Sequence, residues 1–270
     1  MASVSPITSS DSGALAARFG EWREAGRKAL VVYVTAGHPD RARSLDLLRR
    51  LPEAGADVIE LGVPFSDPMA DGPVIQASSQ QALAQGMTFD GALDLLRESG
   101  TAAPVVLFSY LNPILAAGPG AERRAADAGA CGLLLTDLPV GADPALEARF
   151  ASGPLAFVRL VAPTTPRARM AEIARHGGGF VYLISRLGVT GSRDELPADL
   201  AQSVARLREA TSMPVCVGFG ISTPAQAASV ARIADGVVVG SALVKAAEQG
   251  VDQALALVRS LRRAVDGHIT

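Results

Sequence analysis

The sequence alternates short apolar runs with longer amphipathic segments, and this alternation limits its possible folds more than any other feature. Most of the runs are rich in Leu or β-branched residues and begin or end beside Gly or Pro, which is typical of strands. Continuous apolar runs of this length indicate strands that are buried on both faces, as in a parallel sheet covered by helices. The eight expected strands are Leu30–Thr35, Val58–Leu61, Val105–Ser109, Gly132–Thr136, Ala156–Val161, Phe180–Ser185, Val215–Gly218 and Gly236–Gly240.

The segments between these runs have the spacing of amphipathic helices. Leucines recur among Arg and Asp in Ala42–Ala54, and Phe89–Ser99, Leu200–Ala210 and Ala225–Ile233 follow the same rule. Strand alternating with helix eight times over about 250 residues predicts an α/β protein with a (β/α)8 TIM barrel. The rival fold is a doubly wound open sheet, but the GxGxxG that usually follows its first strand is absent.

The two ends of the chain extend this barrel. Gly13–Ala25 predicts an extra N-terminal helix that could plug the bottom of the barrel, and Leu243–Ala264 predicts one or two closing helices. Residues 1–12 lack the basic and apolar regions of a secretory signal, so we expect a flexible tail. No linker interrupts residues 13–267, which we expect to form a single domain. An N-cap residue followed by Pro marks three expected helix starts: Asp143–Pro144, Thr165–Pro166 and Thr223–Pro224.

Charge and composition exclude several classes of function. Lys and Arg total 25 against 27 Asp and Glu, so nothing in the overall charge indicates a nucleic-acid partner. No apolar run approaches the roughly 18 residues that would span a membrane. The two cysteines, Cys131 and Cys216, lie at or inside apolar runs without a CxxC motif or a nearby His. They are expected to be reduced core residues in a cytoplasmic protein rather than a disulfide or a metal site.

Acidic residues gather where the second expected strand ends, in VIELGVPFSDPMADGP. In a barrel of this kind the active site lies at such strand ends. Glu60 falls inside the apolar strand on the same face as Val58, so its carboxylate must point into the barrel mouth or pair with a cation. Asp67 and Asp71 follow in the loop. Carboxylates crowded in this way suit general acid–base chemistry. The alternative is a salt-bridged Glu60 with the two aspartates as turn residues.

Glycines follow the last three expected strands. Glycine lets backbone N–H groups approach a ligand, and a helix N-terminus favours an anion. A phosphate commonly sits between the loops that follow strands seven and eight of such barrels. Gly218, Gly220, Gly240 and Ser241 are placed for that role, and Gly191 could add another amide. The alternative is that these glycines only make tight turns.

The remaining strand ends give weaker signals. Asp137 could orient a ligand or cap a loop, and Tyr110 and Asn112 follow the third expected strand. His38 is expected on a turn before Pro39 rather than as a catalytic base. Several aromatic residues gather on strands or at their ends, where core packing or a flat apolar ligand would explain them. They are Tyr33, Phe65, Phe108, Tyr110, Tyr182 and Phe219.

These residues also carry a resemblance to the alpha subunit of tryptophan synthase. The order and approximate spacing of its motifs hold from about Ala29 to Val244. The matching segments are ELGVPFSDPMADGP (Glu60–Pro73), SRLGVTG (Ser185–Gly191), GFGIS (Gly218–Ser222) and GSALV (Gly240–Val244). The first motif is specific by itself, whereas other phosphate-binding barrels share the glycine motifs. Tyr33 stands where many members have Phe, and Leu160–Pro166 reads LVAPTTP rather than the form with consecutive prolines. These departures are expected to change packing rather than chemistry.

The resemblance implies a lyase without metal or cofactor that splits indole-3-glycerol phosphate into indole and glyceraldehyde 3-phosphate by retro-aldol cleavage. Glu60 would transfer protons at indole C3 and at the glycerol hydroxyl, and Asp71 would hold the ring N–H and stabilise positive charge on that nitrogen. Tyr182 matches a tyrosine near the catalytic glutamate. Thr190 matches a threonine on a loop that contacts the aspartate and closes over the substrate. The implied phosphate site is Gly191, Gly218, Phe219, Gly220, Gly240 and Ser241. The implied indole pocket is Phe108, Leu134, Leu160, Ile184 and Phe219.

The resemblance also implies a partner. The alpha subunit usually joins a pyridoxal-phosphate-dependent beta subunit in an alpha2beta2 hetero-tetramer and passes indole to it through a tunnel. The loop that includes Pro64–Asp71 would lie at that contact, and the loop over Leu187–Leu200 would couple its closure to the beta site. Two alternatives are a stand-alone enzyme that releases free indole and a non-catalytic activating subunit. The intact Glu60 and Asp71 argue against the second. A third alternative is a different phosphosugar enzyme with a barrel fold, such as an isomerase, but the Glu60–Pro73 motif does not support it.

Overall fold

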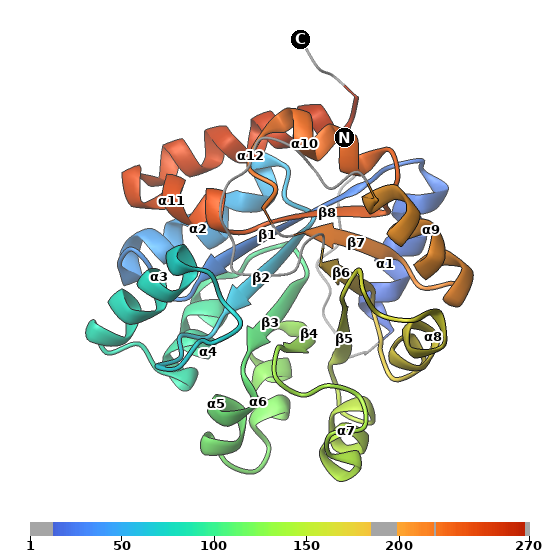
Figure 1. Ribbon diagram of the computed structural model, residues 1–270. Coiled ribbons are helices and arrows are strands. Elements are labelled where there is room, and N and C mark those ends of the chain that lie inside the picture. Colours follow the sequence, from blue (N-terminus) through green and yellow to red (C-terminus); the bar gives the residue numbers. More distant parts are fainter. Residues whose placement is uncertain (1–12, 185–198, 219, 268–270) are drawn as a thin grey trace.

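Eight parallel strands close into a barrel in which each strand pairs with its neighbours in sequence order and the last pairs with the first (Figure 1). The computed structural model describes residues 13–184, 199–218 and 220–267. The strands are β1 (Ala29–Thr35), β2 (Val58–Gly62), β3 (Val105–Ser109), β4 (Ala130–Leu135), β5 (Ala156–Val161), β6 (Val181–Ile184), β7 (Val215–Gly218) and β8 (Gly236–Val239). The predicted (β/α)8 barrel is therefore confirmed, and the expected strands differ from these only at their ends.

Helices surround the ring of strands (Figure 1). They are α1 (Ala14–Glu24), α2 (Arg41–Ala54), α3 (Pro73–Ala84), α4 (Phe89–Ser99), α5 (Leu111–Ala116), α6 (Ala121–Asp127), α7 (Pro144–Ala151), α8 (Arg167–Arg175), α9 (Leu200–Ala210), α10 (Pro224–Ala231), α11 (Ser241–Gln249) and α12 (Val251–Val265). None of the helices in the described ranges has the length and apolar character needed to cross a membrane.

Two of the three predicted N-caps are confirmed. The Asp143 carboxylate accepts hydrogen bonds from the first turn of α7, and Thr223 forms a capping box with Gln226 on α10. The third is wrong, because α8 begins one residue later with Pro166 as its N-cap and has no side-chain cap. The Thr165 hydroxyl instead accepts a hydrogen bond from the Ala162 N–H at 3.2 Å. It therefore stabilises the turn before the helix rather than the helix itself.

The alternation of side chains along each strand sorts them into two apolar layers. On β1, Leu30 and Val32 pack outward in one cluster with the surrounding helices. Val31 packs inward in a second cluster that fills the barrel, and Val58 of β2 joins it. Because Glu60 lies two residues after Val58, the same alternation directs its carboxylate into the barrel. The fold thus places a charged group where its neighbours are apolar.

The N-terminal helix closes the bottom of this interior, as the sequence predicts. Leu15 and Phe19 of α1 are buried in the inner cluster, and the Phe19 ring lies 5.3 Å from that of Phe180, measured between centroids. Both side chains cover apolar surface that the ends of the strands would otherwise expose to water. Access to the barrel interior is therefore left to the opposite end, where the strands finish.

A buried ion cluster joins the last helix to the first strands. The Asp57 carboxylate accepts hydrogen bonds from Arg262 of α12 at 2.7 Å, from Arg27 at 2.6 Å and from the Leu30 N–H at 2.8 Å. Asp57 and Arg262 are both almost fully buried, and an unpaired charge at either position would be strongly destabilising. The cluster fixes α12 against the entrance to β1 and β2.

Candidate active site

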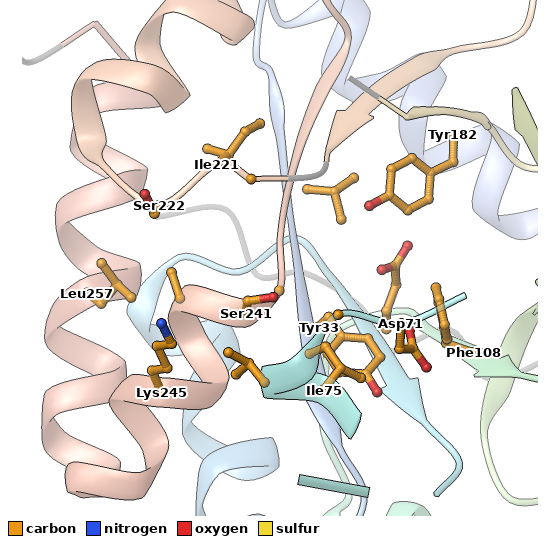
Figure 2. A pocket seen from close by; sticks show the side chains of 17 residues that line it. Tyr33, Asp71, Ile75, Phe108, Tyr182, Ile221, Ser222, Ser241, Lys245 and Leu257 are labelled. Atoms are coloured by element: carbon orange, nitrogen blue, oxygen red, sulfur yellow. The ribbon is translucent and has the colours of Figure 1, made fainter. Parts of the chain in front are cut away.

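A cavity of about 340 Å³ lies at the carboxyl ends of the strands, and its size is typical of a small-molecule site. Its wall comes from five strands and from the segments that follow β2, β7 and β8. Tyr182, Asp71 and Phe108 lie on one side of it, and Ser222 and Lys245 lie on the other (Figure 2). This is the end of the barrel at which the sequence predicts the catalytic groups.

Glu60 is a buried acid without a partner. Its side chain lines the cavity and is 1% exposed, and its Oε1 atom has no hydrogen-bond partner among the described residues. Burial raises the pKa of the Glu60 carboxyl to about 8. Over the described ranges no cation pairs with this carboxyl, which contradicts the salt-bridged alternative. Glu60 therefore holds a proton at neutral pH and can donate it inside the cavity.

Asp71 lines the same cavity but is fixed by a neighbour. The Tyr110 hydroxyl donates a hydrogen bond of 3.0 Å to its Oδ2 atom, and that hydroxyl accepts one of 2.9 Å from the Ala70 N–H. Burial raises the pKa of Asp71 to about 6, and the hydrogen bond from Tyr110 opposes this rise. Asp71 is therefore the acid that ionises first. Asp67 is exposed and accepts a hydrogen bond from Ser66, so only two of the three predicted carboxylates line the cavity.

Aromatic rings form the wall around the two acids. The Tyr33 and Phe108 rings meet edge to face, with centroids 5.2 Å apart. Tyr182 also lines the cavity. Gly218 does not line it, but a Cβ at this position would overlap the Tyr182 hydroxyl. Gly218 therefore makes room for Tyr182, a role different from the direct phosphate contact that the resemblance implies.

The opposite end of the cavity has exposed backbone donors. Gly220, Gly240 and Ser241 line it, as predicted for a phosphate site. Helix α11 begins there with Gly240 as its N-cap, with no side-chain cap and no acidic residue in its first turn. The neighbouring helix α10 differs, because its capping box and the Gln226 side chain already occupy its first N–H groups. Of these two helices, only α11 keeps its N-terminus free of a side-chain cap and so open to an anion.

Other predicted pocket residues lie outside this wall. Leu134 and Leu160 pack in the inner cluster, against which Phe108 also packs, and Ile184 is half-buried at the end of β6. None of these three lines the cavity. Thr190, Gly191 and Phe219, together with most of the loop over Leu187–Leu200, lie outside the described residues. The expected flexible tail, residues 1–12, does so as well.

The weaker candidates have structural roles. Asp137 caps a loop, because its Oδ1 atom accepts a hydrogen bond of 2.7 Å from the Leu111 N–H. His38 lies on a turn before Pro39, as predicted, and does not reach the cavity. Cys131 and Cys216 are buried and free, which confirms the prediction that they are reduced core residues. Over the described ranges no three His, Cys, Asp or Glu side chains gather as a metal site would require.

Several residues that line the cavity are not among the predicted site residues, and Tyr33, Val238 and Lys245 are three of them. Tyr33 carries a signal, since it lies two residues after Val31 and shares its inward face. Val238 has the same kind of signal on β8, where alternate residues face inward. Lys245 lies four residues after Ser241, which is one helical turn further along the same face of α11. This spacing is a sequence signal for Lys245, although only the fold shows that this face of α11 borders the cavity.

The burial of Glu60 predicts a pH-dependent stability difference between the wild type and Glu60→Gln. Below pH 4.5, the ordinary pKa of this group, the carboxyl is protonated in both folded and unfolded chains. As the pH rises towards 8 the unfolded chain releases a proton that the folded chain keeps, so the wild type loses stability. Glutamine does not titrate. Between pH 5 and pH 8, the free energy of unfolding of the variant, measured in urea, should therefore rise relative to that of the wild type by on the order of a few kcal/mol. A difference that is constant with pH would contradict this.

Comparison with known proteins identifies the family. A family model described as tryptophan synthase alpha chain matches residues 19–268. The tryptophan synthase alpha chain of Phenylobacterium zucineum is 49% identical over 92% of this chain and 94% of its own length. The one from Geobacter sulfurreducens is 49% identical over 93% and 98%.

Solved structures agree with this match. Mycobacterium tuberculosis tryptophan synthase contains a chain with a TM-score of 0.87 and 36% identity, which covers 94% of this chain and 99% of that one. Tryptophan synthase subunit alpha from Legionella pneumophila gives a TM-score of 0.84 and 35% identity, with coverage of 94% and 98%. This chain belongs to the tryptophan synthase alpha chain family.

Proposed function

We propose that Glu60 and Asp71 carry out the lyase reaction of the tryptophan synthase alpha chain, in which indole-3-glycerol phosphate is cleaved to indole and glyceraldehyde 3-phosphate. The observation that carries this assignment is the pair of acids in one cavity. Glu60 is buried, has no partner for its Oε1 atom among the described residues and is protonated at neutral pH, whereas Asp71 accepts a hydrogen bond from Tyr110 and ionises near pH 6. Two carboxyls whose pKa values are set apart by their environments suit separate acid and charge-stabilising roles.

The reaction follows from these two protonation states. Glu60 donates its proton to indole C3, which turns the ring into an electron sink with positive charge on the ring nitrogen. The Asp71 carboxylate accepts the ring N–H and stabilises that charge. The Glu60 carboxylate then takes the proton of the glycerol hydroxyl, so that the carbonyl forms and the electrons of the broken C–C bond return to the ring. Glu60 ends protonated, as it began, and no cofactor is required.

The rest of the cavity supports the two ends of this substrate. Phe108 and Tyr33 offer flat apolar surface for the indole, and Phe108 packs against the same inner cluster as Leu134 and Leu160. Tyr182 lies beside the acids. We assign the phosphate to Gly220, Gly240 and Ser241, with Gly218 acting indirectly. Roles for Ile184, Thr190, Gly191 and Phe219 rest on the resemblance alone.

We also propose a tryptophan synthase beta subunit as partner, in an alpha2beta2 hetero-tetramer in the cytoplasm. Membership of the family supports this, as does the exposed surface of the loop after β2, where the Met69 side chain is 89% exposed. The loop that includes Pro64–Asp71 would then transmit the state of the partner directly to Asp71. We propose residues 13–267 as one catalytic domain.

Indole release from indole-3-glycerol phosphate tests this function, measured with the purified chain alone and with a matching beta subunit. We expect slow cleavage alone and a sharp rise when the beta subunit is added. Fast cleavage by the chain alone would favour a stand-alone indole-releasing enzyme. No indole under either condition, from protein shown to be folded, would overturn the lyase assignment and favour a non-catalytic activating subunit.

A further inference from the structure

Lys245 is the one positively charged residue among the described residues that line the cavity. The same wall carries two acids, Glu60 and Asp71. A phosphorylated substrate therefore adds negative charge to a cavity that already contains acidic side chains. Of the 25 basic residues in the chain only two are lysines, Lys28 and Lys245. Lys28 immediately precedes β1 and therefore lies at the opposite end of the barrel. Lysine carries its charge as a compact group on a flexible stem, which suits contact with a phosphate that other groups already hold.

The position of Lys245 matches that of the open helix terminus. Lys245 lies one turn after Ser241 on α11, and both line the cavity together with Ser222 of the segment after β7. Lys245 and Ser222 lie on the side of the cavity away from Asp71 and Phe108 (Figure 2). The cation thus lies on the side of the cavity away from Asp71.

The charge of Lys245 is not neutralised by the protein. Within the described residues its ammonium group makes no ion pair or hydrogen bond, although Asp and Glu are abundant on the outer helices. The next acid on α11, Glu248, instead lies 3.7 Å from Nε2 of His38. Lys245 is exposed, and its unpaired charge on a helix without an N-terminal side-chain cap is available to an anion in the cavity.

We propose that Lys245 is the cationic ligand of the substrate phosphate and determines the preference of the enzyme for a phosphorylated substrate. The proposal rests on the function proposed above and adds a residue to it. Backbone N–H groups orient a phosphate but carry no net charge, whereas the Lys245 ammonium group offsets part of the dianion's charge. The positive and negative ends of the cavity then permit one orientation of the substrate, with its phosphate at α11 and its indole beside Glu60.

Lys245→Met tests the proposal, because methionine keeps much of the apolar stem and removes the charge. We compare kcat and KM for indole-3-glycerol phosphate with those for indoleglycerol, which lacks the phosphate. The ratio of kcat/KM for the two substrates should fall by about 10–100-fold, mainly through a higher KM for the phosphate ester. Lys245→Arg should restore most of the ratio, and Lys28→Met should leave it unchanged.

Two results would overturn this role of Lys245. One is an unchanged ratio in Lys245→Met, and the other is an equal loss on both substrates, which a packing defect would produce. If the wild type cleaves neither substrate, the proposed function has failed instead. The role of Lys245 is then tested separately by measuring the affinity for glycerol 3-phosphate by calorimetry. The wild type should bind glycerol 3-phosphate, and Lys245→Met should bind it about 10–100-fold more weakly. Equal binding by the two proteins would refute the proposal.

Discussion

Glu60→Gln is expected to lower kcat for indole release by about 10²–10⁴-fold, the range that general acid–base groups contribute. The amide has the shape of the carboxylic acid, but it can neither give a proton to indole C3 nor take one from the glycerol hydroxyl. Substrate binding should change little, because Glu60 Oε1 forms no hydrogen bond with the described residues. Single-turnover measurement of indole formation at saturating substrate isolates this effect on the chemical step.

A matched control is available on the outer surface. Glu53→Gln makes the same chemical change at an exposed position of α2, away from the cavity, and should leave kcat unaltered. The Glu60 variant should also unfold at the same urea concentration as the wild type or a higher one, because no buried partner is lost. Near wild-type turnover by folded Glu60→Gln would remove this residue from the mechanism.

Asp71→Asn is expected to lower kcat by about 10²–10³-fold. Removing one group that stabilises charge in the transition state has an effect of this size in other enzymes. An asparagine carbonyl can still accept the ring N–H and the Tyr110 hydroxyl, so the shape of the site is kept. What it lacks is the negative charge that offsets the positive charge on the ring nitrogen. Steady-state kinetics should therefore show the loss in kcat rather than in KM.

The combined variant gives a sharper result for the two acids. If Glu60 and Asp71 act in one step, Glu60→Gln with Asp71→Asn should be little slower than Glu60→Gln alone, because groups that work as a unit are not additive. A rise in KM with unchanged kcat for Asp71→Asn would instead assign Asp71 to ground-state binding. That result would contradict its charge-stabilising role.

The barrel and the position of Glu60 follow from the sequence because both depend on local periodicity. Strand length, flanking Gly or Pro and the two-residue alternation from Val58 suffice to direct Glu60 inward. Asp67 and Asp71 have no such periodicity, since they lie in a loop. The hydrogen bond from Tyr110, which is 39 residues away in the chain, distinguishes Asp71, and sequence spacing does not contain that contact.

Tertiary contacts also explain the errors. Thr165 has the residue type of an N-cap, but the Ala162 N–H competes for its hydroxyl. For Gly218, which has the pattern of a phosphate-binding glycine, the neighbouring Tyr182 side chain gives a second reason for the small size that the pattern does not contain. Lys245 was missed because a single basic residue on an amphipathic helix usually faces solvent. Only the position of α11 at the barrel mouth shows which cavity it borders.

The ion pair between Asp57 and Arg262 has a consequence for how the protein is made. The two residues are 205 positions apart, so during synthesis the Asp57 carboxylate emerges from the ribosome long before its second arginine exists. The seam between β1 and β8 is completed late for the same reason. A nascent chain that stops before Arg262 must bury Asp57 with Arg27 as its remaining cation, and this leaves the truncated product easier for the cell's proteases to open. The last helix is therefore needed to complete the charge pairing of Asp57.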